Sequence, residues 1–288
     1  EQKVVSKIFD GDDFRYYNVT IERPLRLRSQ FNAIKIDEML YDSSELEMSK
    51  WLYQTYGERV FDGLDNEVPA IKEYLNENEI KMTDKKLTKL ISVKAWEDRR
   101  ALQNVAKALM KSIGTEIFMD YNVFSERVAS TAKTLKLDVK ATDIKSIARA
   151  MSVADPEAAP VVKKEHKANS KDIEKLESVY GIAPEVIEDY GYTKQGKGYV
   201  EYESDSDLRD SEKIPVKEDI YEYFQREVRP YVADAWINLP PTKIGCEISF
   251  NKYFYKPAPL RSLAENEADI LALDEKSQGF IKSLFELI

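Results

Sequence analysis

Phe14-Arg15-Tyr16-Tyr17-Asn18-Val19-Thr20-Ile21-Glu22-Arg23-Pro24-Leu25-Arg26-Leu27 is the stretch that decides the fold class of this 288-residue chain. Apolar residues at Tyr17, Val19 and Ile21 alternate with polar ones, a pattern typical of a strand with one buried face. Pro24 ends the strand because proline has no N–H to donate. A strand needs neighbours, yet residues 31–152 carry helical spacing almost throughout. Because the chain also begins at Glu1 rather than a methionine, we expect residues 1–30 to close a sheet supplied by a missing N-terminal part.

Residues 31–152 predict a helical domain. Apolar residues recur there at spacings of three to four, most regularly between Trp96 and Met119. Pro69 fits the first turn of one helix, and Thr83 is a suitable N-cap for a helix that begins at Asp84.

The amino-acid composition changes at residues 153–170, where prolines, alanines and charged residues replace the periodic apolar residues. This composition predicts a flexible linker. Residues 171–260 then predict a small mixed α/β region, with helical segments at Lys171–Tyr180 and Lys217–Val228 and a short strand at Tyr199–Tyr202. The expected fold class is therefore α+β, mostly helical.

Residues 261–288 predict a C-terminal helix with a heptad pattern. Counting from Leu263, six of the eight core positions are apolar, namely Leu263, Ile270, Leu273, Phe280, Leu284 and Leu287. The two polar positions are Asn266 and Ser277. The pattern fits a coiled-coil seam that binds a partner helix, and it also fits an ordinary amphipathic helix docked on its own domain.

The composition is that of a soluble, folded chain, with 43% hydrophobic and 11% aromatic residues. No apolar run approaches the roughly 20 residues that a membrane helix needs, so we expect no membrane association. A single cysteine, Cys246, cannot form an internal disulfide, which fits a reducing cytoplasm.

The formal net charge of −9 argues against a chain that binds DNA through its whole surface, because phosphate affinity comes from clustered lysines and arginines. Residues 81–114 are an exception, with nine basic residues against three acidic ones. The candidate phosphate contacts in this segment are Lys85, Lys86, Lys89, Arg99 and Arg100. The alternative is that these residues are the solvated faces of two helices.

Recognisable catalytic and cofactor motifs are missing from the sequence. Residues 191–198 have P-loop spacing up to Lys197, but Gly198 replaces the hydroxyl residue that holds magnesium, so we expect a glycine turn that enters a strand. A glycine-rich dinucleotide loop is absent. The single histidine, His166, lies in the predicted linker, which excludes His-based metal sites and Ser-His-Asp triads. We therefore expect no catalytic, cofactor-binding or metal site in this chain.

Two segments resemble one protein family. Thr20-Ile21-Glu22-Arg23-Pro24-Leu25-Arg26-Leu27 resembles the segment that closes the catalytic domain in modification (M) subunits of type I restriction-modification systems. Near the other end, residues 217–228, Asp234-Ala235-Trp236-Ile237, Thr242-Lys243-Ile244-Gly245, Glu247-Ile248 and Phe254-Tyr255 resemble the C-terminal region of the same subunits in order and spacing. The chain departs from the family at Arg15, where family members often carry glycine. Asn238-Leu239-Pro240-Pro241 also does not match the Asn-Pro-Pro-aromatic motif of the family, and we interpret it as a turn.

The resemblance implies that residues 1–30 end a methyltransferase domain and that the parent protein transfers a methyl group from S-adenosylmethionine to adenine N6 in DNA. It also implies a specificity (S) subunit and a restriction (R) subunit as partners, with DNA reached through the complex. M subunits of this family pack their C-terminal helices against the S subunit, which favours the partner-binding interpretation of the heptad. Trp236 is expected to anchor the packing of the small domain. This chain would be noncatalytic and would mediate assembly.

The alternative is a protein of a different class, a freestanding helical adaptor or nucleic-acid-binding scaffold with no methyltransferase parent. The reading frame upstream of Glu1 distinguishes the two, because only the first interpretation requires codons for a glycine-rich loop and an Asn-Pro-Pro-Phe motif.

Overall fold

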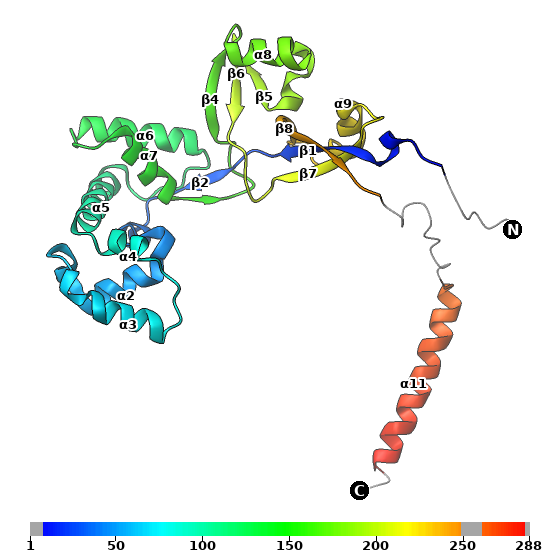
Figure 1. Cartoon of the computed structure of the whole chain (residues 1–288), viewed down its shortest axis with the longest axis horizontal. Coiled ribbons are helices and arrows are strands. Elements are labelled where there is room, and N and C mark those ends of the chain that lie inside the picture. Colours follow the sequence, from blue (N-terminus) through cyan, green and yellow to red (C-terminus); the bar gives the residue numbers. More distant parts are fainter. Residues whose placement is uncertain (1–7, 249–260, 286–288) are drawn as a thin grey trace.

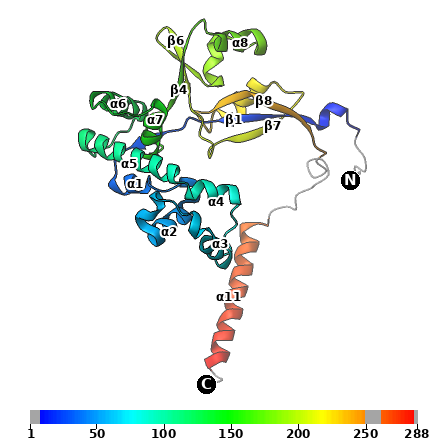
Figure 2. The same cartoon turned by 60° about the vertical axis from the view of Figure 1, so that its left-hand side comes forward.

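The computed structural model describes residues 8–248 and 261–285 of the chain, and the side chains at positions 274 and 278–285 are not described. The described part is α+β and mostly helical, as the sequence predicts. Figures 1 and 2 show a group of helices and one long C-terminal helix, and the strands form two three-stranded sheets and one two-stranded sheet.

β1 (Arg15–Glu22) is the central strand of a three-stranded antiparallel sheet with the order β7-β1-β8. Its neighbours are β7 (Asp210–Pro215) and β8 (Trp236–Cys246), from near the other end of the chain. Ile21 pairs with Asp210 on one side and with Ile237 on the other. The expectation that this strand has lost its sheet is therefore wrong, because the same chain occupies both of its edges.

The alternation of β1 is confirmed on its apolar face. Val19 and Ile21 are buried in a core cluster with Ile214 of β7 and Ile237 of β8, and Tyr17 packs against it. Glu22 departs from the pattern, because it is buried although it lies on the polar face. Its carboxylate forms an ion pair with Arg209.

A short two-stranded sheet brackets the helical part. β2 (Leu27–Ser29) pairs antiparallel with β3 (Ser152–Ala154), so the chain enters and leaves residues 33–150 at the same place. The helices between them are α1 (Ala33–Glu38), α2 (Leu46–Tyr56), α3 (Val68–Glu77), α4 (Asp84–Ile91), α5 (Val93–Ile113), α6 (Tyr121–Thr134) and α7 (Ala141–Ala150), with 3₁₀ turns η2 (Ser43–Glu45), η3 (Gly57–Phe61) and η4 (Asp65–Glu67).

Two hydrophobic clusters hold the helical part together, and α5 contributes to both. Trp96, near the start of α5, is fully buried in a cluster with residues of α2, α3 and α4. Leu109, further along α5, is fully buried in a second cluster with residues of α6 and α7. The predicted cap is confirmed, because the Thr83 side chain accepts a hydrogen bond from the backbone N–H of Lys86.

The prediction of a flexible linker at residues 153–170 is wrong. Backbone hydrogen bonds tie this segment to the chain that follows β1, from Val161 N–H to the Leu25 carbonyl and from Asp155 N–H to the Arg26 carbonyl. Ala158 and Val161 are buried, and β4 (Val162–Lys167) follows directly. Prolines and charged residues are compatible with this path because most of it lies outside regular strands, where a missing N–H donor breaks no ladder.

β4 belongs to a second three-stranded antiparallel sheet with the order β4-β6-β5. Its other strands are β5 (Tyr192–Gln195) and β6 (Gly198–Tyr202), and α8 (Lys171–Tyr180) and the 3₁₀ helix η5 (Pro184–Tyr190) lie between β4 and β5 in the chain. The glycine turn expected within residues 191–198 is confirmed. It connects β5 to β6, so it leads into a strand rather than into a helix.

The remaining elements are helical and lie beside the first sheet or at the C-terminal end of the chain. They are η1 (Gly11–Phe14), α9 (Ile220–Tyr223), the π-helical turn η6 (Phe224–Val228) and α11 (Leu263–Phe285). Phe224 and Val228 pack into the core beside β1. Between Asn238 and Lys243 the register of β8 shifts, so Pro240 and Pro241, which cannot donate, lie where the ladder is interrupted rather than in a separate turn.

Trp236 joins the two sheets, as expected for a packing anchor. It is 8% exposed, and a Cβ added at Gly191 would lie 2.9 Å from its indole ring. Gly191 also has φ of +88°, which glycine adopts without strain. The departure at Arg15 needs no glycine, because its φ of −94° and ψ of 143° are ordinary extended values.

A pair of glycine substitutions tests this contact. Gly191→Ala should lower the free energy of unfolding more than Gly181→Ala, by about 1–3 kcal/mol, because only the first alanine overlaps the Trp236 ring. Gly181 is a matched control, since its φ of +67° is also positive but no atom lies within 4 Å of its added Cβ. Urea unfolding followed by circular dichroism measures both, and equal losses would contradict the packing role of Trp236.

Candidate functional site

The predicted partner-binding residues lie on α11. Its start is fixed by a capping box, in which the Glu265 N–H donates to the Ser262 hydroxyl at 3.2 Å and the Ser262 N–H donates to the Glu265 carboxylate at 2.8 Å. Leu263, Ile270 and Leu273 are 88%, 65% and 65% exposed. Phe280 and Leu284 lie within the helix, although their side chains are not described, and Leu287 lies outside the described residues.

Within the described residues, Leu263, Ile270 and Leu273 are therefore not covered by another part of the chain, which differs from the alternative of an amphipathic helix docked on its own domain. Figure 1 draws α11 apart from the sheets and the helical part. At this exposure, the large apolar side chains form a solvent-exposed apolar face on the helix, and such a face is typical of an interaction site.

The five candidate phosphate contacts come together on α4 and α5, but most are already paired. Lys86 forms an ion pair with Glu45 at 2.7 Å, and Arg100 forms one with Glu58 at 2.6 Å. The acidic partners come from η2 and η3, which the sequence places outside the basic segment. The local positive charge counted along residues 81–114 is thus largely neutralised in space.

Arg99 is the most enclosed of these residues. Its guanidinium lies 3.2 Å from Asp42 and 5.0 Å from the centre of the Trp96 ring, and its side chain is 14% exposed. Burial lowers the pKa of Arg99, although Asp42 opposes the shift. A group held in this way links α5 to the start of η2 and is poorly placed to contact a phosphate.

Lys85 and Lys89 differ from the other three. Within the described part of the chain neither is in an ion pair, and both are exposed on α4, one turn apart. They are the members of the predicted set that form no ion pair within the described residues, although the charge of Lys89 still helps to lower the pKa of Asp42. The candidate nucleic-acid surface is therefore reduced to these two lysines.

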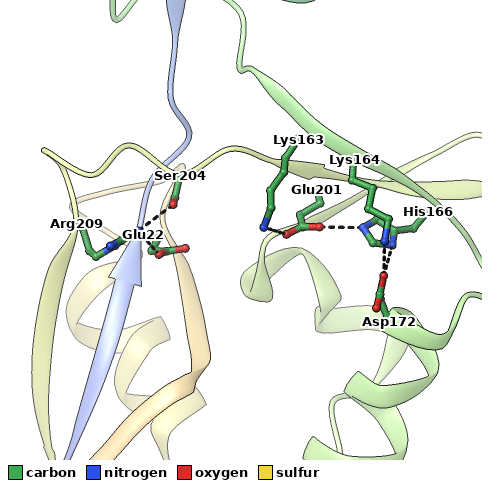
Figure 3. A network of polar contacts seen from close by, with 8 residues as sticks. All are labelled: Glu22, Lys163, Lys164, His166, Asp172, Glu201, Ser204 and Arg209. Atoms are coloured by element: carbon green, nitrogen blue, oxygen red, sulfur yellow. Dashed lines mark hydrogen bonds and ion pairs between the residues drawn. The ribbon is translucent and has the colours of Figure 1, made fainter. Parts of the chain in front are cut away.

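A polar network that the sequence did not reveal lies on the β4-β6-β5 sheet (Figure 3). His166 is 5% exposed and is held between two carboxylates, with Nε2 at 2.9 Å from Glu201 and Nδ1 at 3.3 Å from Asp172. Lys163 and Lys164 complete the network through Glu201 and Asp172. The one signal in the sequence was the cluster of charged residues in Val162–Lys167, which fits an exposed strand as well as a loop.

Hydrogen bonds set the charge state of Glu201. Burial alone would raise the pKa of this carboxyl, but hydrogen bonds from Lys163 and His166 outweigh it and bring the pKa below its ordinary value of 4.5. Glu201 is therefore a carboxylate at neutral pH.

A second polar group lies nearby on the other sheet. Glu22 of β1 accepts from Arg209 at 3.0 Å, and Arg209 also donates to the Ser204 hydroxyl at 3.2 Å (Figure 3). Glu22 and Glu201 both line one cavity of about 240 Å³ between the sheets. The sequence gave no indication that these two carboxylates share a cavity.

The described residues hold no group of three or more His, Cys, Asp or Glu side chains arranged for a metal ion. Within the same residues, no helix combines the length and apolar character that crossing a bilayer requires. Comparison with protein-family models, curated proteins and solved structures gives no significant match.

The pKa of Glu201 predicts a pH dependence. Because the folded carboxyl has a lower pKa than the unfolded one, its stabilisation is complete above pH 4.5 and is lost as the pH falls through the folded pKa. Glu201→Gln should therefore lose less stability than the parent chain when the pH is lowered from 5 to about 3, as measured by urea unfolding at each pH. Glu177→Gln, an exposed change on α8, is the control and should follow the parent chain. Parallel curves for all three proteins would contradict the role of the network.

Proposed function

We propose that this chain is the noncatalytic C-terminal region of the modification subunit of a type I restriction-modification system, and that it mediates assembly with the specificity subunit. The parent protein would methylate adenine N6 in DNA with S-adenosylmethionine, as part of a cytoplasmic complex that also includes a restriction subunit. The catalytic and cofactor motifs would belong to another part of that parent.

One observation carries this proposal: the two segments that resemble the family meet in one sheet. β1 ends with Thr20-Ile21-Glu22 of the first segment, and β8 contains Trp236-Ile237 and Thr242-Lys243-Ile244-Gly245 of the second. Glu22 pairs with Trp236 and Tyr16 pairs with Gly245. Segments that resemble one family at both ends of a chain are expected to contact each other if they evolved as one unit.

Residues of β1 and of the second segment also depend on each other. A Cβ at Gly245 would overlap the ring of Tyr16, so a glycine at this position permits the close pairing of β1 with β8. Phe224 and Val228, from the helical part of the second segment, pack against Val19 and Ile21. Tyr16 and Val19 precede Thr20 in β1, so these contacts support the pairing of β1 as a whole with the second segment.

The exposed face of α11 supports the assembly role. Fully burying a large apolar side chain contributes roughly 1.5 to 3 kcal/mol, so a helix that covers Leu263, Ile270 and Leu273 would gain substantial free energy before entropy is subtracted. We therefore assign the seam to the specificity subunit.

The charges of α11 favour a different chain over a second copy of itself. The helix carries five carboxylates and two lysines, namely Glu265, Glu267, Asp269, Asp274 and Glu275 against Lys276 and Lys282. In a parallel pair of identical helices, the heptad places Asp269 opposite Asp274 of the other copy, and like charges there are unfavourable. A partner helix with an apolar seam flanked by basic residues fits better.

Co-purification with the specificity subunit encoded beside the parent gene tests the assembly role. Leu273→Asp combined with Phe280→Asp should weaken binding by about a hundredfold or more, because two large side chains of the seam are replaced by charges. Leu271→Asp is the matched control, since Leu271 is 58% exposed on the same helix but lies outside the heptad core. Circular dichroism should show all variants folded. Undiminished binding of the double variant would overturn the assignment of the seam, and no binding by the unaltered chain would favour a freestanding adaptor.

The two unpaired lysines of α4 give a prediction for the whole complex. Lys85→Glu combined with Lys89→Glu should weaken DNA binding and make the slope of log affinity against log salt shallower by up to about 1.8, since each phosphate contact contributes about 0.9. The control is Lys140→Glu combined with Lys145→Glu, which makes the same charge change at exposed positions near and on α7. An unchanged slope would mean that Lys85 and Lys89 are solvated surface.

A further inference from the structure

The charges around the cavity between the two sheets cancel. Glu22 pairs with Arg209, and the two oxygens of Glu201 are engaged by the Lys163 ammonium at 2.5 Å and by Nε2 of His166 at 2.9 Å. The two carboxylates are thus balanced by the Arg209 and Lys163 cations. A charged ligand would bring a charge without a free partner into a partly buried site, which costs free energy. The charge balance therefore favours a neutral ligand.

Aromatic rings are enriched in the wall of this cavity. They make up five of the sixteen described residues that line it, against 11% of the whole chain. The five are Tyr180, Tyr190, Tyr192, Tyr202 and Trp236. Aromatic rings pack favourably on other rings in offset-stacked or edge-to-face arrangements. A wall of this composition therefore favours a planar ligand.

Tyr202 is the ring that we expect to stack on such a ligand. Within the described residues, its ring forms no contact with another ring or with a cation. The Tyr190 ring, by contrast, already stacks on Tyr221 with 6.3 Å between the ring centres. The Tyr192 ring meets His166 edge to face at 5.3 Å. Tyr202 can therefore contact a ligand without giving up a ring contact that the fold already uses.

The cavity also offers unpaired, neutral hydrogen-bonding groups. The Asn238 amide lines it, can both donate and accept, and forms no hydrogen bond with the described part of the chain. The indole N–H of Trp236 also has no partner there, and it is not sealed from solvent as that of Trp96 is. Burial, with neighbouring carboxylates, raises the pKa of both Tyr190 and Tyr192 to about 12, so these phenols stay neutral at pH 7. A ligand with donors and acceptors along its edge can pair with these groups.

The size of the cavity sets the size of the ligand. Its volume of about 240 Å³ is smaller than the roughly 300–1,000 Å³ of pockets for drug-sized ligands. One small ring system fits this space, whereas a sugar and a phosphate attached to the ring would extend beyond it.

We propose that this cavity binds one neutral planar heterocycle of the size of a nucleobase, stacked on Tyr202 and hydrogen-bonded along its edge to Asn238 and Trp236. This site is separate from the seam of α11 and does not rest on the proposed assembly role. The heterocycle could be a free base or nucleoside, or an unpaired base within a nucleic acid, since all of these present the same ring.

Calorimetric titration of the whole chain at pH 7 with three neutral probes tests the chemistry of the site. Adenine should bind. Toluene is planar but has no hydrogen-bonding edge, and cyclohexanecarboxamide is polar but not planar, so each should bind at least about tenfold more weakly. No binding of adenine, or binding of either other probe as tight as that of adenine, would overturn the proposal.

Labelling with 5-fluorotryptophan locates the site. The chain has three tryptophans, and Trp236 is the one that lines this cavity. Its fluorine resonance should shift when adenine is added, while those of Trp51 and Trp96 should not. Adenine binding without a shift at Trp236 would show that the ring binds elsewhere.

Two sets of variants test the residues. Asn238→Leu should weaken adenine binding by about tenfold, because leucine has a similar size but cannot form the hydrogen bonds of the amide. Asn169→Leu is the control, since Asn169 is exposed between β4 and α8 and does not line the cavity. Equal affinities of these two variants for adenine would contradict the role of Asn238.

Tyr202→Leu should also weaken adenine binding, whereas Tyr202→Phe, which keeps the ring, should bind adenine as the parent chain does. This pair decides the matter if Asn238→Leu fails to fold, as judged by circular dichroism. Unchanged affinity in Tyr202→Leu, or equal losses in the leucine and phenylalanine variants, would contradict stacking on this ring.

A final comparison identifies the source of the ring. The trinucleotide TpApT should bind more tightly than adenosine if the natural ligand is a base within a nucleic acid, because the neighbouring nucleotides add contacts outside the cavity. If the trinucleotide binds less tightly than adenosine, the natural ligand is a free base or nucleoside. Failure of both to bind would overturn the proposal, while leaving the co-purification test of α11 unaffected.

Discussion

The fold depends on β1 being held between two strands from near the other end of the chain. The ladder from Tyr16 to Ile21 pairs with β7 on one side, and β8 pairs along most of the other. Closing so long a loop is entropically tolerable because the cost grows only with the logarithm of its length. The β2–β3 pair reduces the problem further, since it returns the chain from the helical part to the point where that part began. The cavity between the sheets and the contact between the two family-like segments both follow from this closure.

Local structure could be predicted from the sequence, because its causes are local. Each such feature depends on residues only a few positions apart in the sequence. Examples are the Thr83 cap, the helical period of α5 and the alternation of Val19 and Ile21. The partners of β1 could not be predicted, because alternation states that a strand is half-buried without saying against what. The path of residues 153–170 was missed for a similar reason. Its prolines and charges are typical of a loop, and its order comes from hydrogen bonds to residues 25 and 26.

The candidate sites show the same division between local pattern and spatial arrangement. The heptad of α11 is visible in the sequence, but only the structure shows that Leu263, Ile270 and Leu273 are uncovered by the other described residues. The basic segment misled, because Glu45 and Glu58 neutralise Lys86 and Arg100 from outside it. Glu22 and His166 had ordinary sequence surroundings. His166 reaches Glu201 because β4 pairs with β6, and Glu22 shares a cavity with Glu201 because the two sheets approach each other.

Hydrogen exchange of the backbone amides is the most direct test of the central claim that β1, β7 and β8 form one sheet. The account predicts that amides of residues 15–22, 210–215 and 236–246 in the ladder open with a common free energy, because none of these strands can leave without exposing its neighbours. If residues 15–22 exchange at the rate of an unfolded chain while β7 and β8 stay protected, β1 belongs to a sheet supplied by other protein, and the account is contradicted.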